Sequence, residues 1–318
     1  MDMNVTTLSP NDVIVASSRI VDRIRRTPIM RSPEINDLLG LEVFFKCEHL
    51  QDTGSFKLRG ASHAVGLLDA DCPGVATHSS GNHGAALAKA ARDRGLVAHV
   101  VMPDNAVRTK VEAVRHYGGQ VHFCAPNQAA REAGLGTLVE QGFAAIPPYD
   151  DDRIITGQGS CALELIEQVP DLDVIIAPVG GGGLLAGTAL AALTADRPPR
   201  VLAAEPAGAD DTLRSLKLGH RVEDHQPLTI ADGLRALVGV RNLAIISEHV
   251  EQVVAVSEAE IIDAMDLLWS RLKQVVEPSG AVSLAGLKKL AETMPGKRVG
   301  VIISGGNLDV APLLETLR

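Results

Sequence analysis

The first candidate for chemistry is Lys57, which lies in the segment TGSFKLRG at residues 53–60. A lysine amine among small and apolar groups can have a lowered pKa, and the neutral amine can attack a carbonyl carbon to form an imine. An ordinary surface lysine in a turn is equally compatible with this segment. The residue type offers nucleophilic chemistry, and the rest of the chain has to show whether it is used.

A second candidate is the segment SSGNHG at residues 79–84, which runs from a predicted strand into an Ala-rich helix. Two hydroxyls, an amide and the free backbone N–H groups at a helix start suit an anion such as a carboxylate. The predicted substrate-binding residues here are Ser79, Ser80, Gly81, Asn82 and His83. Simpler interpretations stay open, because a single residue is enough for an N-cap and a lone histidine is more often structural.

A third candidate is the tetraglycine segment GGGGLLAG at residues 180–187. Four glycines let backbone amides surround a phosphate at the start of a helix. The segment also satisfies a GxGxxA pattern through Gly181, Gly183 and Ala186, and Glu205 follows about twenty residues later, as in dinucleotide-binding enzymes. From this segment alone a nicotinamide oxidoreductase stays open.

Together the three segments offer a lysine for an imine, a carboxylate site and a phosphate cup, which are the parts needed to hold pyridoxal phosphate and an amino acid. At this point the chain resembles the fold-type II pyridoxal-phosphate enzymes, and within them the serine racemase and serine/threonine dehydratase group. The resemblance covers nearly the whole chain through the ordered motifs GSFKLRGA, SSGNHGAALA, ITGQGS, PVGGGGLLAG, AAEPAGADD, TIADGL, VEPSGA and ISGGN. It implies a tryptophan synthase β-like, two-domain α/β fold with open, mostly parallel sheets flanked by helices.

The resemblance assigns roles to the residues of these motifs. It implies that Lys57 forms the imine with the cofactor and then removes the α-proton, with Phe56 behind the ring. Asn82 is expected at the 3′ oxygen of the cofactor and Ser304 at its pyridine nitrogen. The residues expected to bind the cofactor phosphate are Gly180, Gly181, Gly182, Gly183 and Leu184. Ser80 is expected on the opposite face, as a second acid/base. Glu277 matches a glutamate near the ring.

The implied reaction converts L-serine, L-threonine or a related β-hydroxy amino acid to a 2-keto acid and ammonia. Racemisation of serine is also available through Ser80, and a 3-hydroxyaspartate dehydratase or a dedicated serine racemase are the alternatives. Tyr149 stands where the racemases have an asparagine and favours a dehydratase. Arg131 matches an arginine that reaches the substrate in the racemase group, and it favours a substrate with a second carboxylate.

The motif AAEPAGADD also implies a metal site. In the racemase group this motif binds a divalent cation through a glutamate, a backbone carbonyl and an aspartate. The corresponding residues here are Glu205, Ala209 and Asp211. Oxygen ligands of this kind suit Mg²⁺, Mn²⁺ or Ca²⁺. A solvated acidic loop is the alternative interpretation. Asp52 and Ala85 replace the lysine and glutamine that bind ATP in animal racemases, so nucleotide activation is not expected.

Alternating strands and helices must position these segments. Apolar strands are predicted at residues 74–80, 96–103, 120–126, 173–179, 200–206 and 297–307, with helices between them, which indicates parallel sheets. A first helix is predicted from Ser9-Pro10 to Thr27-Pro28, and Ser257 with Glu260 forms a capping box for a later one. The segment at 146–153 suggests a large domain of residues 1–69 and 150–318 and a small domain of residues 70–149.

Composition limits the partners. The formal charge of −9 argues against nucleic acid or an anionic membrane as the main partner. Residues 174–195 carry no charge, but Pro178 and the four glycines interrupt them, so no membrane span is expected. Four cysteines without a CxxC pair and no visible secretory signal predict a reducing, cytoplasmic location. The resemblance implies a homodimer. A non-catalytic amino-acid sensor stays open, although an intact Lys57 argues against it.

Overall fold

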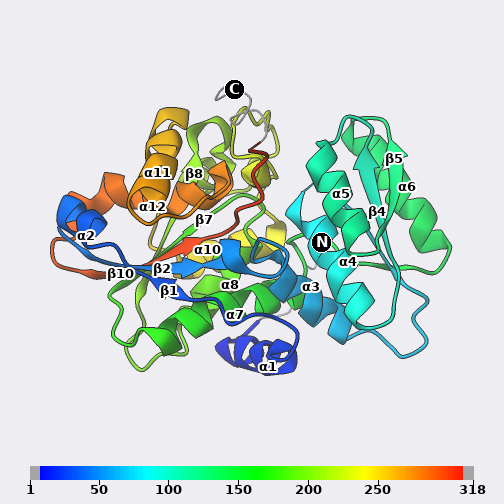
Figure 1. The fold of residues 1–318 in the computed structure, drawn as a ribbon, viewed down its shortest axis with the longest axis horizontal. Helices are drawn as coiled ribbons and strands as arrows, with labels where there is room; N and C mark the ends of the chain where they lie inside the picture. Colours follow the sequence, from blue (N-terminus) through cyan, green and yellow to red (C-terminus); the bar gives the residue numbers. More distant parts are fainter. Residues whose placement is uncertain (1–7, 80, 311–318) are drawn as a thin grey trace.

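The chain forms two lobes that lie side by side in the computed structural model, which describes residues 8–79 and 81–310 (Figure 1). The strands are β1 (Ile29–Met30), β2 (Glu42–Cys47), β3 (Val75–His78), β4 (Ala98–Pro103), β5 (Gln120–Cys124), β6 (Ala144–Ala145), β7 (Val174–Pro178), β8 (Arg200–Pro206), β9 (Gln252–Val256) and β10 (Arg298–Ile303). The α-helices are α1 (Pro10–Ile20), α2 (Pro33–Leu39), α3 (Lys57–Gly66), α4 (Asn82–Asp93), α5 (Arg108–His116), α6 (Gln128–Glu140), α7 (Asp152–Gln168), α8 (Gly183–Ala192), α9 (Asp211–Leu218), α10 (Val240–His249), α11 (Glu258–Ser270) and α12 (Pro278–Leu290). Short 3₁₀ turns are η1 (Glu48–Leu50), η2 (Ala207–Ala209), η3 (Asp232–Leu234) and η4 (Ala291–Thr293).

The larger lobe is built on a six-stranded sheet in the order β1-β2-β10-β7-β8-β9. All neighbours are parallel except β1, which pairs antiparallel with β2 at one edge. Apolar side chains of α11 and α12 cover one face, and those of α1, α7, α8 and α10 cover the other. A sheet covered on both faces explains why its inner strands read as continuous apolar runs.

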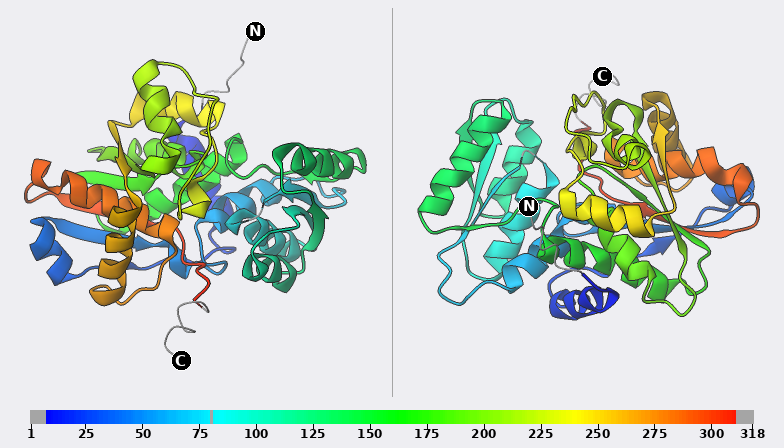
Figure 2. Two further views of the ribbon diagram at one scale, coloured as in Figure 1. Left: turned by 90° about the horizontal axis from the view of Figure 1, so that it is seen from above. Right: turned by 180° about the vertical axis from the view of Figure 1, so that it is seen from behind.

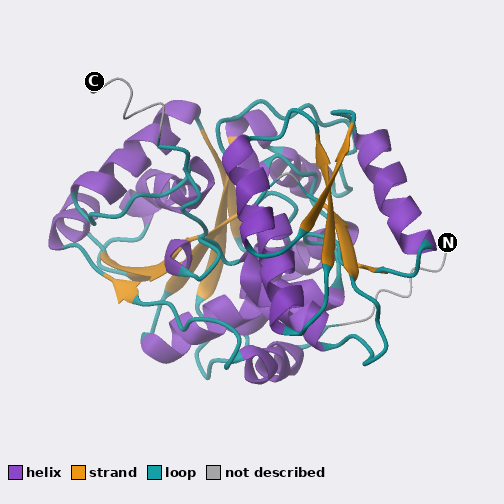
Figure 3. Ribbon diagram, turned by 45° about the vertical axis from the view of Figure 1, so that its right-hand side comes forward, coloured by secondary structure: helices purple, strands orange, loops and turns teal. Residues whose placement is uncertain are grey.

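The smaller lobe is built on a four-stranded, all-parallel sheet in the order β5-β4-β3-β6. Figure 3 shows the strands of the molecule in two separate groups, with helices between and around them. The prediction of an α/β fold with open, mostly parallel sheets flanked by helices is confirmed. The four strands of the small lobe all come from residues 75–145, and the exact domain boundaries at 70 and 149 stay a prediction.

The helix that begins with Lys57 is shared by both lobes. Leu58 and Ala61 of α3 pack into the same apolar cluster as Val75 and Val100 of the small sheet. Ile154 of α7, from the larger lobe, completes that cluster. The two further views in Figure 2 place α3 where the lobes meet.

The first helix is shorter than the sequence suggests. The predicted helix to Thr27-Pro28 is wrong, because α1 ends at Ile20 and the chain turns at residues 21–24. Val21, the residue after α1, is 64% exposed, whereas Ile24 packs against the apolar cluster of the small lobe from the turn. The capping box of Ser257 and Glu260 at the start of α11 is confirmed. Within the described residues, no helix combines the length and apolar character needed to cross a membrane.

Candidate active site

The loop before Lys57 is fixed to the end of the central strand β10. Phe56 N donates to Ser304 O at 3.1 Å, and Gly306 N donates to Gly54 O at 2.9 Å. Ser55 and Gly305 form an isolated antiparallel bridge between these two contacts. Lys57 itself is the first residue of α3. The GGN loop and the lysine segment therefore form one unit.

Lys57 is half-buried, and its ammonium donates to Pro148 O at 2.8 Å. Its Nζ lies 5.1 Å from the centre of the Phe56 ring. Burial lowers the pKa of Lys57 to about 8, and no carboxylate of the described residues opposes that effect. At pH 7 about a tenth of the amine is then neutral, against about three in ten thousand for an ordinary lysine. Lys57 is thus prepared for the nucleophilic chemistry that the sequence suggested.

The tetraglycine segment follows β7 and opens α8. Gly182 is in the left-handed region with φ 93° and serves as the N-cap. A Cβ on Gly180 would lie 2.7 Å from Leu234 Cα, and one on Gly181 would lie 2.4 Å from the Tyr149 ring. Only glycine fits these two positions, because Leu234 and Tyr149 fill the space where a Cβ would stand. The free N–H groups of Gly183 and Leu184 in the first turn suit a phosphate.

A buried asparagine that the sequence analysis missed holds this segment in place. Asn242 of α10 donates from Nδ2 to Gly181 O at 2.6 Å, and Gly239 N donates to the same oxygen at 3.0 Å. The carbonyl of Gly181 is thereby held by the protein, which leaves the amides to face a ligand. Asn242 lies in the segment VGVRNLAI. A polar residue at the start of an apolar helix was the feature of the sequence that could have indicated a buried hydrogen bond.

The SSGNHG segment runs from β3 into α4, as predicted. Asn82 is the first residue of α4, and Gly81 is its N-cap. Gly81 N donates to Ser79 Oγ at 3.3 Å. The predicted acid/base Ser80 lies outside the described residues. His83 is buried, and one of its ring nitrogens pairs with Ile146 O at 3.1 Å. Burial lowers the pKa of His83 to about 3, which keeps the imidazole neutral.

Asn82 connects the two lobes through two hydrogen bonds. Its Nδ2 donates to Glu277 Oε1 at 2.7 Å, and its Oδ1 accepts from Asn307 Nδ2 at 2.9 Å. These partners fix the orientation of the amide and leave its second N–H for a ligand. Burial raises the pKa of Glu277 to about 7, which Lys110 and the bond from Asn82 oppose.

Ser304 lies beside this pair, at the end of β10. Its side chain is buried, and its Oγ donates to Ser279 O at 3.3 Å. The backbone bonds described above join the loop before Lys57 to Ser304 and Gly306. The next residue, Asn307, bonds to Asn82. The structure thus brings the predicted lysine, the asparagine and the serine to the junction of the lobes.

Arg131 lies on α6 of the small lobe and is half-buried. Its guanidinium adds to burial in lowering the pKa of His78, which ends β3. It also opposes burial and Asp150, which raise the pKa of Tyr149. The Nε of Arg131 donates to Asn127 O at 3.5 Å, at the start of its own helix. Its contact with a substrate stays a prediction.

Glu205 and Asp211 form a buried acidic pair behind the tetraglycine segment. Glu205 Oε1 accepts from Leu213 N at 2.7 Å, and Asp211 Oδ2 accepts from Val238 N at 2.8 Å. Their other oxygens, Oε2 and Oδ1, are buried and have no hydrogen-bond partner among the described residues. Burial, with a contribution from the charge of Asp211, raises the pKa of Glu205 to about 8.

His225 Nδ1 lies 3.7 Å from Asp211 Oδ1, so the aspartate faces a histidine as well as the glutamate. Two buried carboxylates of this kind fit a hard cation. Ala209, the predicted carbonyl ligand, is buried at the end of η2 between them in sequence. Within the described part of the chain, no three His, Cys, Asp or Glu side chains gather in a way that could hold a metal. A cation here would therefore need the carbonyl and water besides the two carboxylates.

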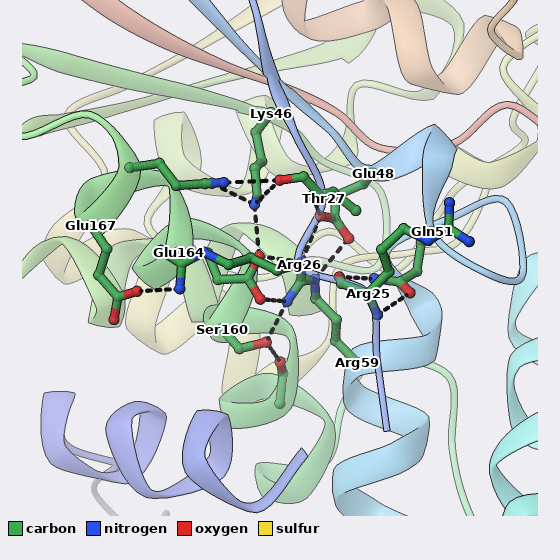
Figure 4. A network of polar contacts seen from close by, with 12 residues as sticks. Arg25, Arg26, Thr27, Lys46, Glu48, Gln51, Arg59, Ser160, Glu164 and Glu167 are labelled. Carbon is green, nitrogen blue, oxygen red and sulfur yellow. Dashed lines mark hydrogen bonds and ion pairs between the residues drawn. The ribbon is translucent and has the colours of Figure 1, made fainter. Parts of the chain in front are cut away.

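A second feature that the sequence analysis missed anchors α3 from below. Arg59 is fully buried, and its guanidinium forms paired hydrogen bonds with Glu48 and with Glu164 (Figure 4). Lys46 donates to Glu164 Oε2 at 2.7 Å and to Thr27 O at 2.9 Å. The two cations and two anions balance, and together they tie α3 to β2, η1 and α7. Lys57 stands two residues from Arg59, so this network fixes the helix that carries the lysine.

Comparisons with known proteins agree with this arrangement. The model of the family described as pyridoxal-phosphate dependent enzyme matches residues 20–305. A beta-hydroxyaspartate dehydratase of Paracoccus denitrificans is 48% identical over 95% of this chain and 97% of its own. An L-threo-3-hydroxyaspartate ammonia-lyase of Saccharomyces cerevisiae is 40% identical over 94% of this chain and 93% of its own. The crystal structure of a serine racemase from Dictyostelium discoideum superposes with a TM-score of 0.90 at 46% identity, covering 95% of this chain and 99% of that one.

Proposed function

The chain belongs to the family of pyridoxal-phosphate dependent enzymes, and on that premise we propose that it is a dehydratase that converts a β-hydroxy amino acid to a 2-keto acid and ammonia. Membership decides against the nicotinamide interpretation of the tetraglycine segment. The observation that carries the proposal is Lys57, a half-buried amine with its pKa lowered to about 8 at the junction of the two lobes. Such an amine is suited to hold a carbonyl cofactor and to accept a proton.

The residues present fit the cofactor. The N–H groups of the segment from Gly180 to Leu184 would hold its phosphate, because α8 starts there and the N–H groups of its first turn have no partner within the helix. The second N–H of Asn82 would reach a ring oxygen, and Ser304 Oγ would stand at the ring nitrogen. When bound, pyridoxal phosphate supplies a sink for the electrons left by removal of the α-proton.

Lys57 performs the proton transfer in this proposal. Its amine is neutral in a useful fraction near pH 7, and burial keeps water from competing for the proton. The hydroxyl of Ser304 would be a neutral partner for the ring nitrogen and would leave that nitrogen unprotonated. A weaker electron sink favours rapid loss of the β-hydroxyl. Ser80, proposed as the acid/base on the other face, would add racemisation as a secondary activity.

We propose 3-hydroxyaspartate as one substrate, because Arg131 matches an arginine that reaches the substrate in the racemase group. A substrate with a second carboxylate would gain a charge-assisted contact there that serine and threonine lack. Two relatives that share at least 40% of their residues with this chain are named for hydroxyaspartate. The serine racemase from Dictyostelium supports serine as the second candidate.

Three further proposals accompany this function. A divalent cation would bind Glu205, Asp211 and the carbonyl of Ala209, since both carboxylates are buried and a cation would offset their charge. Its role is to neutralise the pair and to order the loop, because the base and the electron sink are supplied elsewhere. The homodimer and the cytoplasmic location stay predictions of the sequence.

The proposal is tested with purified holoenzyme and a panel of L- and D-serine, L- and D-threonine and the isomers of 3-hydroxyaspartate. Keto acid and ammonia are measured, and chiral chromatography follows the enantiomers. We expect keto acid from at least one β-hydroxy substrate. A holoenzyme that binds pyridoxal phosphate but yields no keto acid from any member of the panel would rule the dehydratase out.

A further inference from the structure

Among the described residues, two lysines of the small lobe form ion pairs with the larger lobe: Lys89 lies 4.0 Å from Asp52, and Lys110 makes the closer pair. Lys110 of α5, in the small lobe, pairs with Asp232, the first residue of η3 in the larger lobe. The two side chains are only 13% and 34% exposed. A neighbouring pair on the same helix is different, because Arg108 and Glu112 are 90% and 52% exposed and lie within α5. The pair across the lobes is shielded from solvent, and it can form only when the lobes are close.

The turn that carries Asp232 contacts both ends of the proposed cofactor site. Leu234 Cα packs against Gly180 so closely that no Cβ would fit between them. Gly233 N donates to Ser279 Oγ at 3.0 Å, and Ser279 O accepts from Ser304 Oγ. η3 therefore lies between the tetraglycine segment and Ser304.

The chain after η3 is held just as firmly. Val238 N donates to Asp211, and Gly239 N donates to Gly181 O. Asp232 is thus presented by a segment that the large lobe fixes at several points. The approach of Lys110, by contrast, depends on the position of the small lobe. The ion pair of Lys110 with Asp232 therefore forms when the small lobe lies close to the larger one, and it stabilises that arrangement.

Two other charged groups act on Lys110 besides Asp232. Glu277, which bonds to Asn82, is a second anion, and Arg235 is a cation. A cation in a shielded position needs a close anion, and Asp232 supplies it. If the lobes separated by more than a few ångströms, Lys110 and Asp232 would both lose their partner.

From these contacts we propose that Lys110 and Asp232 form a latch that holds the lobes together over Lys57. They act as positioning residues, since neither is placed to touch the reacting atoms. The latch deepens the proposed function, because it defines when the substrate is enclosed. It depends on a bound cofactor but not on which amino acid is turned over.

A double-mutant cycle tests the latch. The variants are Lys110→Met, Asp232→Asn and the double variant, with Arg108→Met as the matched control on the same helix. The readout is the rate at which hydroxylamine bleaches the visible absorbance of bound pyridoxal phosphate, together with kcat and KM for the best substrate of the panel. Hydroxylamine needs access to the cofactor and no turnover.

We expect each single variant to raise the bleaching rate and KM about tenfold, the size of effect of a shielded charge pair. The double variant should match the single ones, because both changes break the same contact. Arg108→Met should behave like the parent. Single variants that bleach at the parental rate, or effects that multiply in the double variant, would overturn the latch. A missing keto acid with an intact cycle would reject the dehydratase and leave the latch standing.

Discussion

Replacing Arg59 with methionine removes the centre of the buried network beneath α3. The side-chain volume is largely kept, but paired hydrogen bonds to Glu48 and Glu164 are lost, four contacts of 2.7–2.8 Å. Lys46 then faces two buried carboxylates alone, so the network changes from balanced to one net negative charge. Removing one partner of a buried charge pair costs about 3–5 kcal/mol.

This cost can be expressed as a melting temperature. An unfolding entropy of about 2.1 cal/mol/K per residue gives roughly 0.67 kcal/mol/K for the 318 residues of this chain. The variant should therefore melt about 4–8 °C below the parent. The matched control is Arg200→Met, which breaks the pair of Arg200 with Glu251, whose side chains are 47% and 48% exposed. An exposed pair of this kind contributes at most about 1 kcal/mol, or less than about 2 °C.

The pH dependence gives the experiment a second arm. Burial would raise the pKa of Glu48, but Arg59 and Lys46 hold it below its usual value. A carboxyl whose pKa is lowered by folding stabilises the fold above its unfolded pKa, and that contribution is lost as the pH falls. In the variant, Glu48 takes up a proton more readily. The difference in melting temperature should be largest near pH 7 and should narrow below about pH 5.

Thermal melts of the two holoenzymes and of the control, followed by circular dichroism from pH 4 to 8, decide the matter. If Arg59→Met melts within about 2 °C of the parent at pH 7, the network is not stabilising α3 as described. A gap that stays constant over the whole pH range would show that lost packing, and not the uncompensated carboxylate, is the cause.

Three further predictions concern the site. Lys57→Ala should lose the visible absorbance and all turnover, whereas the control Lys289→Ala, an exposed lysine that pairs with Glu260 within the larger lobe, should keep both. Arg131→Ala should lower kcat/KM for 3-hydroxyaspartate about ten- to a hundredfold while serine changes little, since a charge-assisted contact contributes about 1.5–3 kcal/mol; an equal loss on both substrates would refute its role as a side-chain selector. EDTA should lower the melting temperature, and Mg²⁺, Mn²⁺ or Ca²⁺ should restore it. The variant Asp211→Asn should have a lower melting temperature that added metal does not change. A parent whose melting temperature EDTA does not change would show that Glu205 and Asp211 form a pair without a metal.

Much of the site could be predicted because its chemistry is local in sequence. The tetraglycine segment and SSGNHG each carry their own backbone requirement, and each occurs where an apolar strand gives way to a helix. The resemblance then placed Lys57 and Ser304 in the same site. The fold class followed from the alternation of strands and helices, although the short edge strand β1 gave no readable pattern.

The contacts between distant segments could not be predicted in the same way. Lys46 and Glu164 are 118 residues apart, and each stands as a lone charge in an apolar run, VFFKC and ALELI. Such a charge signals a buried partner without saying which one. The same holds for Lys110 and Asp232, separated by 122 residues, and for Asn82 and Glu277, separated by 195. Their pairing depends on how the two lobes meet, which no local pattern records.

The sharing of α3 between the lobes has a consequence for biosynthesis. The small sheet is complete once the ribosome has passed Ala145, but its apolar cluster still lacks Ile154 of α7. The cluster also needs Leu58, which is made before the first strand of that sheet. The small lobe therefore cannot mature as an autonomous unit of residues 70–149 while the chain is growing. A nascent chain halted at residue 150 should stay sensitive to protease, and one extended through α7 should be more resistant, so the small lobe matures only together with α3 and α7.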